Sequence, residues 1–199
     1  MTHELTRRTL VAGLGAVAGA TLAAPAFSAI QGELGQNNRQ ALPLGPVVRT
    51  ANGAVRGNQA NGVHVFRGLR YGAPAGGTNR FKPPVKPALW TGIMDALTNG
   101  PSAPQQLDQP SETGDGGSRP RTSEDCLFLN LFTPAVNDSG KRPVMVWIHG
   151  GGYSKGSGTE PGNDGSHLAR ENDVVVVTVN HRLNAFGYLY LGDVLGPAY

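Results

Sequence analysis

One run of β-branched residues constrains the fold of this chain more than any other feature of its sequence. Residues Val174–Val179 are five valines and one threonine, with no charge among them. β-Branched side chains favour strands, and a nearly continuous run of them is typical of a strand that is covered on both faces. We therefore expect this run in the interior of a sheet.

Two further apolar runs of strand length, Leu127–Phe132 and Val144–Ile148, precede it, and both are bounded by proline or glycine. Residues 164–171 lie between the second and third runs and can form a short helix with Asp164 as its cap. The order strand, loop, helix, strand favours parallel pairing and predicts an α/β fold.

The earlier part of the chain predicts a small antiparallel meander. Val47–Thr50, Ala54–Gly57 and Val63–Leu69 are short strand candidates separated by Asn-Gly pairs, which accept the backbone angles of tight hairpin turns. Residues 71–87 and 100–123 are rich in proline, glycine and serine, so we expect surface loops there.

Residues 1–26 are typical of an export signal. Arg7 and Arg8 stand just before residues 11–24, a weakly apolar run rich in alanine and glycine. This pattern predicts a twin-arginine signal peptide that is cleaved after Ala26 or Ser28. A membrane anchor is the alternative, but the run is short for a bilayer and is interrupted by glycines, so we expect no stable anchor. The twin-arginine machinery would therefore export the protein to the periplasm or the outside.

Composition argues against disorder and against nucleic acid as a partner. Hydrophobic residues make up 39% and charged residues 16% of the chain, which suits a packed core, and the net charge is only +3. Residues 49–86 carry seven basic side chains and no acid, whereas residues 87–125 carry six acids and two bases. A nucleic-acid stripe with Phe66, Tyr71 and Phe81 as stacking groups is the alternative. We expect instead that the two segments neutralise each other within one fold.

Neither a metal nor another cofactor is indicated. The single cysteine, Cys126, cannot close an internal disulfide or form a multi-cysteine zinc site, and we expect a small buried thiol there. His149, His167 and His181 have spacings that match no metal-ligand motif.

The strongest chemical signal is His149–Gly152, which reads His-Gly-Gly-Gly directly after the apolar run 144–148. Glycines let the backbone approach a ligand closely, and backbone N–H groups there can stabilise the oxyanion that forms when an ester carbonyl is attacked. This motif after a strand is typical of lipases and esterases. A phosphate loop is not indicated, because Ser157 follows Gly156 where that motif needs a lysine. A plain tight turn remains the alternative.

Several segments together resemble the type-B carboxylesterases, the family that includes cholinesterases and bacterial para-nitrobenzyl esterases. They follow the family's order: Phe66–Gly72, Asn79–Phe81, Trp90, Ser123–Asn130, His149–Gly152 and Asn180–Leu189. The resemblance covers residues 47–199 and leaves residues 27–46, which show no periodicity, as a flexible leader. It implies an α/β-hydrolase fold, with a meander followed by the first strands of a mostly parallel central sheet. It also implies a serine esterase that acts on small to medium esters through an acyl-enzyme.

The resemblance implies a role for each residue of the glycine motif. Gly151 and Gly152 would donate their N–H groups to the oxyanion, while Gly150 would give the loop its shape. His149 would position the loop and would not be the catalytic base. Tyr153 would line the substrate pocket.

Other positions are implied to be structural. Arg80 and Glu124 would form an ion pair, and Arg182 would find its acidic partner beyond residue 199. Arg70 replaces a proline that is usual in the family, and Asn184 replaces a usual glycine, so the family does not predict the turns at these two positions.

The pattern G-x-S-x-G occurs at Gly152–Gly156, but Ser154 there does not lie in an elbow between a strand and a helix, and in this fold the catalytic acid and histidine follow the serine along the chain. Ser154, Ser157 and Ser166 offer hydroxyls, but none lies in an elbow between a strand and a helix. We therefore expect the front part of an esterase, inactive by itself, which supplies an oxyanion hole but no nucleophile. The alternatives are a non-catalytic cholinesterase-like adhesion protein and an inactive truncated gene product. The truncated product should be unstable, because strand 174–179 would lack helices on its faces.

Overall fold

The computed structural model describes residues 42–106 and 121–199. The predicted signal peptide, nearly all of the predicted leader and residues 107–120 of the second predicted loop lie outside the described residues. The strands are β1 Leu44–Arg49, β2 Ala54–Ala60, β3 Val63–Arg70, β4 Ile93–Asp95, β5 Phe128–Thr133, β6 Val144–Ile148 and β7 Val175–Val179. The α-helices are α1 Ser166–Asn172, α2 Asn184–Tyr188 and α3 Gly192–Leu195, and 3-10 turns lie at Gly77–Asn79 and Pro161–Asn163.

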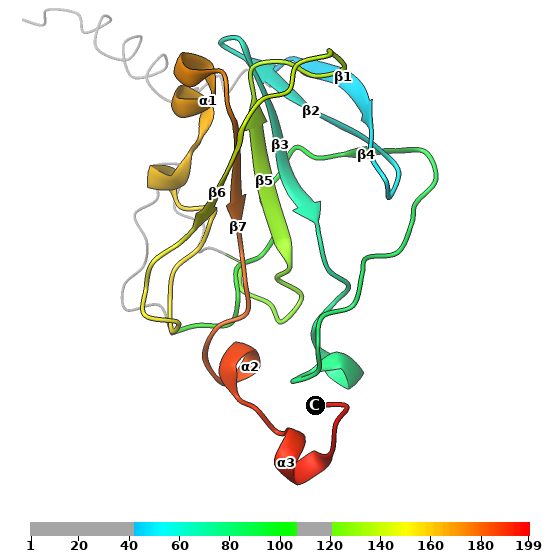
Figure 1. The fold of residues 1–199 in the computed structure, drawn as a ribbon, viewed down its shortest axis with the longest axis vertical. Helices are drawn as coiled ribbons and strands as arrows, with labels where there is room; N and C mark the ends of the chain where they lie inside the picture. The colour runs from blue at the N-terminus through cyan, green and yellow to red at the C-terminus, as the bar shows by residue number, and fades with distance from the viewer. Residues whose placement is uncertain (1–41, 107–120) are drawn as a thin grey trace, which may run out of the picture. The chain divides into compact units, whose positions relative to one another are not determined.

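The strands form one mixed sheet in the order β1-β2-β3-β5-β7-β6, with β4 parallel to β2 (Figure 1). The predicted parallel pairing holds for β6 and β7, whereas β5 is antiparallel to both β3 and β7. Parallel neighbours need a crossover of a dozen or more residues, and the segment that carries α1 between β6 and β7 provides one. The ten-residue link between β5 and β6 has no helix, so these two strands run in opposite directions.

The predicted meander is present as β1, β2 and β3, which pair antiparallel in sequence order. Asn61 and Gly62 adopt φ angles of 51° and 76° in the second turn, as a tight hairpin requires. β1 begins at Leu44, three residues before the expected start, so the last residues of the predicted leader belong to the sheet. The reason is pairing, since Leu44 lies opposite Asn58 in the longer β2. β4 was not predicted, because three residues are too short to give a periodic signal.

Helix α1 covers one face of the sheet. It packs on β3, β5 and β7, and the buried residues there are Val63, Val65, Phe132, Ala169 and Val176. The helix begins at Ser166, close to the expected start, and the Asp164 carboxylate accepts a hydrogen bond of 2.9 Å from the Ser166 N–H. The N-cap is nevertheless Gly165, without a side-chain cap hydrogen bond, so the predicted cap position is wrong by one residue.

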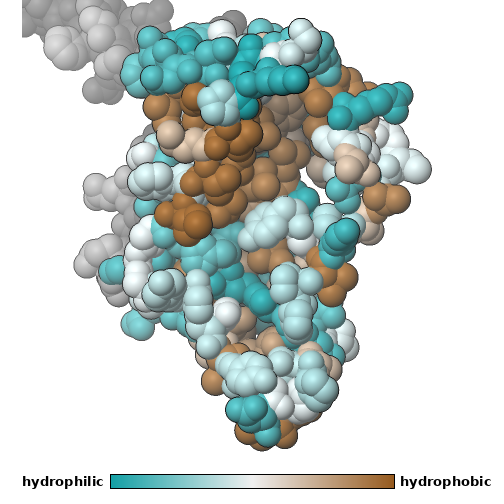
Figure 2. All heavy atoms as spheres, in the orientation of Figure 1, coloured by the Kyte–Doolittle hydropathy of each residue, from teal (hydrophilic) through white to brown (hydrophobic). Residues whose placement is uncertain are grey.

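The opposite face of the sheet is only partly covered in the described residues. Neighbouring residues of a strand point to opposite faces, so Phe66, Leu131 and Val175 lie away from α1. They line an apolar hollow of about 380 Å³. Figure 2 shows apolar side chains gathered over the middle of the molecule. The two-sided burial expected for residues 174–179 is thus seen on the α1 face, where Val176 is buried, and only in part on the other.

Ion pairs join the basic segment 49–86 to the acidic segment 87–125, as the charge pattern predicts. The pairs are Arg56–Asp95, Arg70–Asp125 and Arg80–Glu124. Such pairs contribute little stability each, but they place a carboxylate beside each of these three arginines. Among the described residues, no helix has the length and apolar character needed to cross a membrane.

Candidate active site

The glycine motif begins directly after Ile148, the last residue of β6. The last paired residues are Ile148 and Val179, and a histidine follows shortly after each strand end. The rings of His149 and His181 stack with centroids 4.5 Å apart and an interplanar angle of 10°. His149 is only 8% exposed, and its Nδ1 lies 2.8 Å from the carbonyl oxygen of Gly150. These contacts suit a residue that holds the loop.

The backbone of the glycine loop adopts conformations that few side chains tolerate. Gly151 has φ 115°, and a β-carbon there would lie 1.9 Å from the Lys155 carbonyl oxygen. Gly152 and Tyr153 follow with φ 60° and 61°. Glycine at position 151 is therefore required by both the backbone angle and the close approach of Lys155.

The Gly151 carbonyl is turned into the loop. It accepts hydrogen bonds from the N–H groups of Ser154 and Lys155 at 3.1 and 3.2 Å, and from the Ser154 hydroxyl at 3.0 Å. Within residues 42–106 and 121–199, the N–H groups of Gly151 and Gly152 donate no hydrogen bond, and both residues are exposed. The loop thus presents two neighbouring backbone N–H groups from which an anionic oxygen can accept hydrogen bonds.

The three serines named by the sequence are not activated in the described residues. The Ser154 hydroxyl bonds to the Gly151 carbonyl, and Ser166 is the first residue of α1. Ser157 is buried, and its hydroxyl bonds to Ser102 at 2.9 Å and to Asn180 at 3.0 Å. None of the three hydroxyls bonds to a histidine in the described part of the chain, as an activated serine nucleophile needs.

Tyr153 lies beside the loop and is 69% exposed. Its ring meets the edge of the Tyr188 ring from α2 at a centroid distance of 4.8 Å. The Tyr188 hydroxyl in turn lies 3.3 Å from Nδ1 of His181. The rings of Tyr153, Tyr188 and His181 therefore lie together on one side of the glycine loop.

The structure brings Arg80 and Glu124 together. The guanidinium donates two hydrogen bonds to the carboxylate, at 2.6 and 2.5 Å, and these bonds lower the pKa of Glu124 below its ordinary value. Arg70 makes a similar bidentate pair with Asp125 and lies over the Phe128 ring at 4.4 Å. Both pairs fix the segment that precedes β5.

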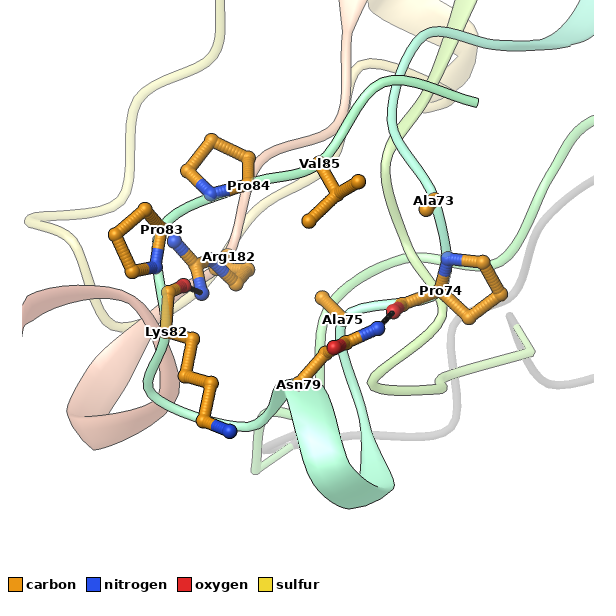
Figure 3. A pocket seen from close by; sticks show the side chains of 9 residues that line it. All are labelled: Ala73, Pro74, Ala75, Asn79, Lys82, Pro83, Pro84, Val85 and Arg182. Carbon is orange, nitrogen blue, oxygen red and sulfur yellow. Dashed lines mark hydrogen bonds between the residues drawn. The ribbon is translucent and has the colours of Figure 1, made fainter. Parts of the chain in front are cut away.

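Arg182 has no carboxylate partner among the described residues, and its Nη1 donates to the Lys82 carbonyl oxygen at 2.8 Å. Figure 3 shows the guanidinium beside Pro83 and Pro84 at a small cavity. With a volume of about 10 Å³, this cavity has room for about one water molecule and none for an organic ligand.

Cys126 is fully buried and is a free thiol. Burial is the main cause that raises its pKa to about 11, so the thiol stays protonated and unreactive at neutral pH. In the described ranges, no three histidine, cysteine or acidic side chains gather where they could hold a metal ion.

The role of two residues, Gln105 and Asn180, in holding the loop was not predicted from the sequence. Gln105 lies in an irregular proline-rich segment, and its partner is Gly156, far along the chain. The Asn180 amide oxygen accepts from the Gly158 N–H at 2.8 Å. Asn184 has φ 56°, a conformation that asparagine tolerates better than most residues. No local sequence pattern predicts that Gln105 pairs with Gly156 or Asn180 with Gly158, because these partners are far apart in the chain.

Comparison with known proteins places this geometry in a family. Residues 45–197 match the Carboxylesterase family. The para-nitrobenzyl esterase of Bacillus subtilis (strain 168) is 46% identical over 147 residues, which cover 74% of this chain and 29% of that protein. Neuroligin-2 of Mus musculus is 38% identical over 187 residues, with 74% of this chain and 22% of the neuroligin covered.

A solved structure described as a thermophilic PNB esterase superposes with a TM-score of 0.71 at 44% identity. It covers 77% of this chain, and the chain covers 31% of that protein. The chain therefore spans less than a third of the length of these relatives, and the matched fold is the α/β-hydrolase fold.

Proposed function

The chain belongs to the carboxylesterase family, and from this premise we propose that it forms part of a serine hydrolase that cleaves small to medium carboxylic esters. Similarity alone does not decide the activity, because the relatives include a neuroligin as well as esterases. The observation that carries the proposal is the pair of backbone N–H groups at Gly151 and Gly152, which donate no hydrogen bond to any residue that the structure describes.

The proposed chemistry assigns this chain one task. When a serine hydroxyl adds to the ester carbonyl, its proton passes to a histidine and the carbonyl electron pair moves onto oxygen. The N–H groups of Gly151 and Gly152 would bond to that oxygen more strongly than to the uncharged carbonyl, which lowers the barrier. The intermediate then expels the alcohol, which takes the proton from the histidine and leaves an acyl-enzyme for water to hydrolyse. The G-x-S-x-G match at Gly152–Gly156 does not join a strand directly to a helix as a nucleophile elbow does, so the chain alone should not turn over.

A labelling experiment tests this proposal. The natural protein that contains these residues is treated with a fluorophosphonate probe and assayed with a para-nitrophenyl ester, beside the 199-residue chain as a matched control. We expect labelling and hydrolysis by the natural protein and neither by the 199-residue chain. Absence of labelling in the folded natural protein would overturn the proposal, as would labelling of Ser154, Ser157 or Ser166 in the short chain.

We further propose that the twin-arginine machinery exports the protein after it has folded, to the periplasm or the outside. The support is the Arg7-Arg8 pair before the weakly apolar run. Replacing both arginines by lysine keeps the charge and should leave the precursor inside the cell with its signal attached. Unchanged export of the double variant would refute a twin-arginine route.

A further inference from the structure

The far end of the glycine loop is packed against its beginning. At Gly156 a β-carbon would lie 2.4 Å from the carbonyl oxygen of Gly150 and 2.5 Å from Nδ1 of His149. The backbone of Gly156 is therefore packed closely against the first residues of the loop and cannot move toward them without displacing them. The position of Gly156 therefore affects where the glycine triplet lies.

One side chain holds both backbone groups of Gly156. The Gln105 amide oxygen accepts from the Gly156 N–H at 2.8 Å, and the Gln105 NH₂ donates to the Gly156 carbonyl at 2.9 Å. The same NH₂ group lies 3.2 Å from the carbonyl oxygen of Ala103, which is buried. A two-point hydrogen bond fixes both the distance and the orientation of the peptide that it holds.

A second amide holds the middle of the loop. The Asn184 N–H donates to the Tyr153 carbonyl at 2.9 Å, and its side-chain NH₂ donates to the Ser154 carbonyl at 3.0 Å. That NH₂ group also donates to the Pro104 carbonyl at 3.1 Å. Both amides therefore join the glycine loop to one segment, residues 103–105.

We propose that Gln105 and Asn184, together called the amide clamp, are positioning residues that hold the Gly151 and Gly152 N–H groups in the geometry that binds the oxyanion. This inference rests on the proposed function. Neither clamp residue touches the substrate. The clamp acts through the loop backbone, and a displacement of about 1 Å in such a donor can lower the rate about a hundredfold.

The test uses Gln105→Ala and Asn184→Gly in the natural protein. Glycine at position 184 keeps the positive φ angle and deletes only the amide. Gln106→Ala is the matched control, because Gln106 is the exposed neighbour and makes no hydrogen bond in the described part of the chain. The readouts are kcat, KM, the melting temperature and the inhibition constant of a trifluoromethyl ketone, whose adduct with serine carries an oxyanion.

We expect each clamp variant to lower kcat about tenfold and to weaken the ketone by a similar factor, with KM changed less than about threefold. The control should match the parent protein in all four readouts. A merely structural role would lower the melting temperature and leave the kcat of the folded fraction unchanged, and this result would overturn the proposal.

Two further variants, Gln105→Glu and Gly151→Ala, separate failure of the clamp proposal from failure to fold and from failure of the proposed function. If Gln105→Ala does not fold, Gln105→Glu replaces it, since the carboxylate still accepts from Gly156 but opposes the Gly156 and Ala103 carbonyls. Gly151→Ala is measured in parallel. Loss of kcat in Gly151→Ala but not in the clamp variants refutes the clamp alone, whereas full kcat in Gly151→Ala refutes the proposed function itself.

Discussion

Replacing Gly151 by alanine should lower kcat about a hundredfold, because the new β-carbon cannot fit without moving the loop. It would lie 1.9 Å from the Lys155 carbonyl oxygen, whereas real contacts of this kind are essentially never shorter than 3.0 Å. The loop must therefore open by about 1.1 Å, and alanine must also leave or strain the φ angle of 115°, at a cost of about 1–3 kcal/mol.

A shift of that size takes at least one of the two N–H groups out of hydrogen-bond range of the oxyanion. Loss of one such donor typically costs a factor of about 100 to 1,000, and a hundredfold loss corresponds to about 2.7 kcal/mol of transition-state stabilisation. The binding of the uncharged ester depends less on these donors, so KM should change little.

The assay is steady-state hydrolysis of a para-nitrophenyl ester by the natural protein, with the melting temperature recorded for each variant. Gly162→Ala is the matched control, because a β-carbon there meets no atom within 4 Å among the described residues and its φ angle is ordinary. The reasoning is refuted if Gly151→Ala folds and keeps kcat within about threefold of the parent.

Two further predictions concern the buried thiol and the ion pair before β5. Burial raises the pKa of the Cys126 thiol to about 11, so it should not react with a disulfide reagent at pH 8 until the protein is unfolded, and rapid native reaction would contradict its burial. Hydrogen bonds from Arg80 lower the pKa of Glu124 below 4.5, so the pair stabilises the folded state above about pH 4.5, and this contribution disappears as the pH falls through the lowered pKa. Arg80→Gln should therefore lower the urea midpoint more at pH 7 than at pH 3, and an equal loss at both pH values would show that the ion pair is not responsible.

Local sequence patterns predicted the elements that are built from local forces. The β-branched run at 174–179 became β7, and the Asn-Gly pair at 61–62 became a hairpin turn with positive φ angles at both residues. Asp164 lies one residue before the observed N-cap, Gly165, and its carboxylate accepts a hydrogen bond from the Ser166 N–H. In each case the preference lies in the residue itself or in its immediate neighbours.

The strands that differ from the sequence prediction are the ones that depend on long-range pairing. β1 begins earlier than expected because Leu44 finds a partner in β2, and β4 exists only through its pairing with β2. The direction of β5 is set by the length of the link to β6, which no property of the strand itself encodes.

The candidate site also contains residues that a local motif predicts and residues that only the folded chain brings together. His149 and Gly150–Gly152 were predicted from sequence because the motif is contiguous, and Gly151 and Gly152 have positive φ angles that favour glycine. Arg80 and Glu124 came from the family resemblance, since nothing in their spacing pairs them. Gln105 was missed because its hydrogen bonds reach Gly156, and only the folded chain brings these two residues together.

The most direct test is a crystal structure of the natural protein after reaction with a phosphonate that mimics the tetrahedral intermediate. The account predicts that the phosphoryl oxygen accepts hydrogen bonds of about 2.7–3.1 Å from the N–H groups of both Gly151 and Gly152. An adduct whose oxygen points elsewhere, with those two N–H groups bonded to other protein atoms, would contradict it.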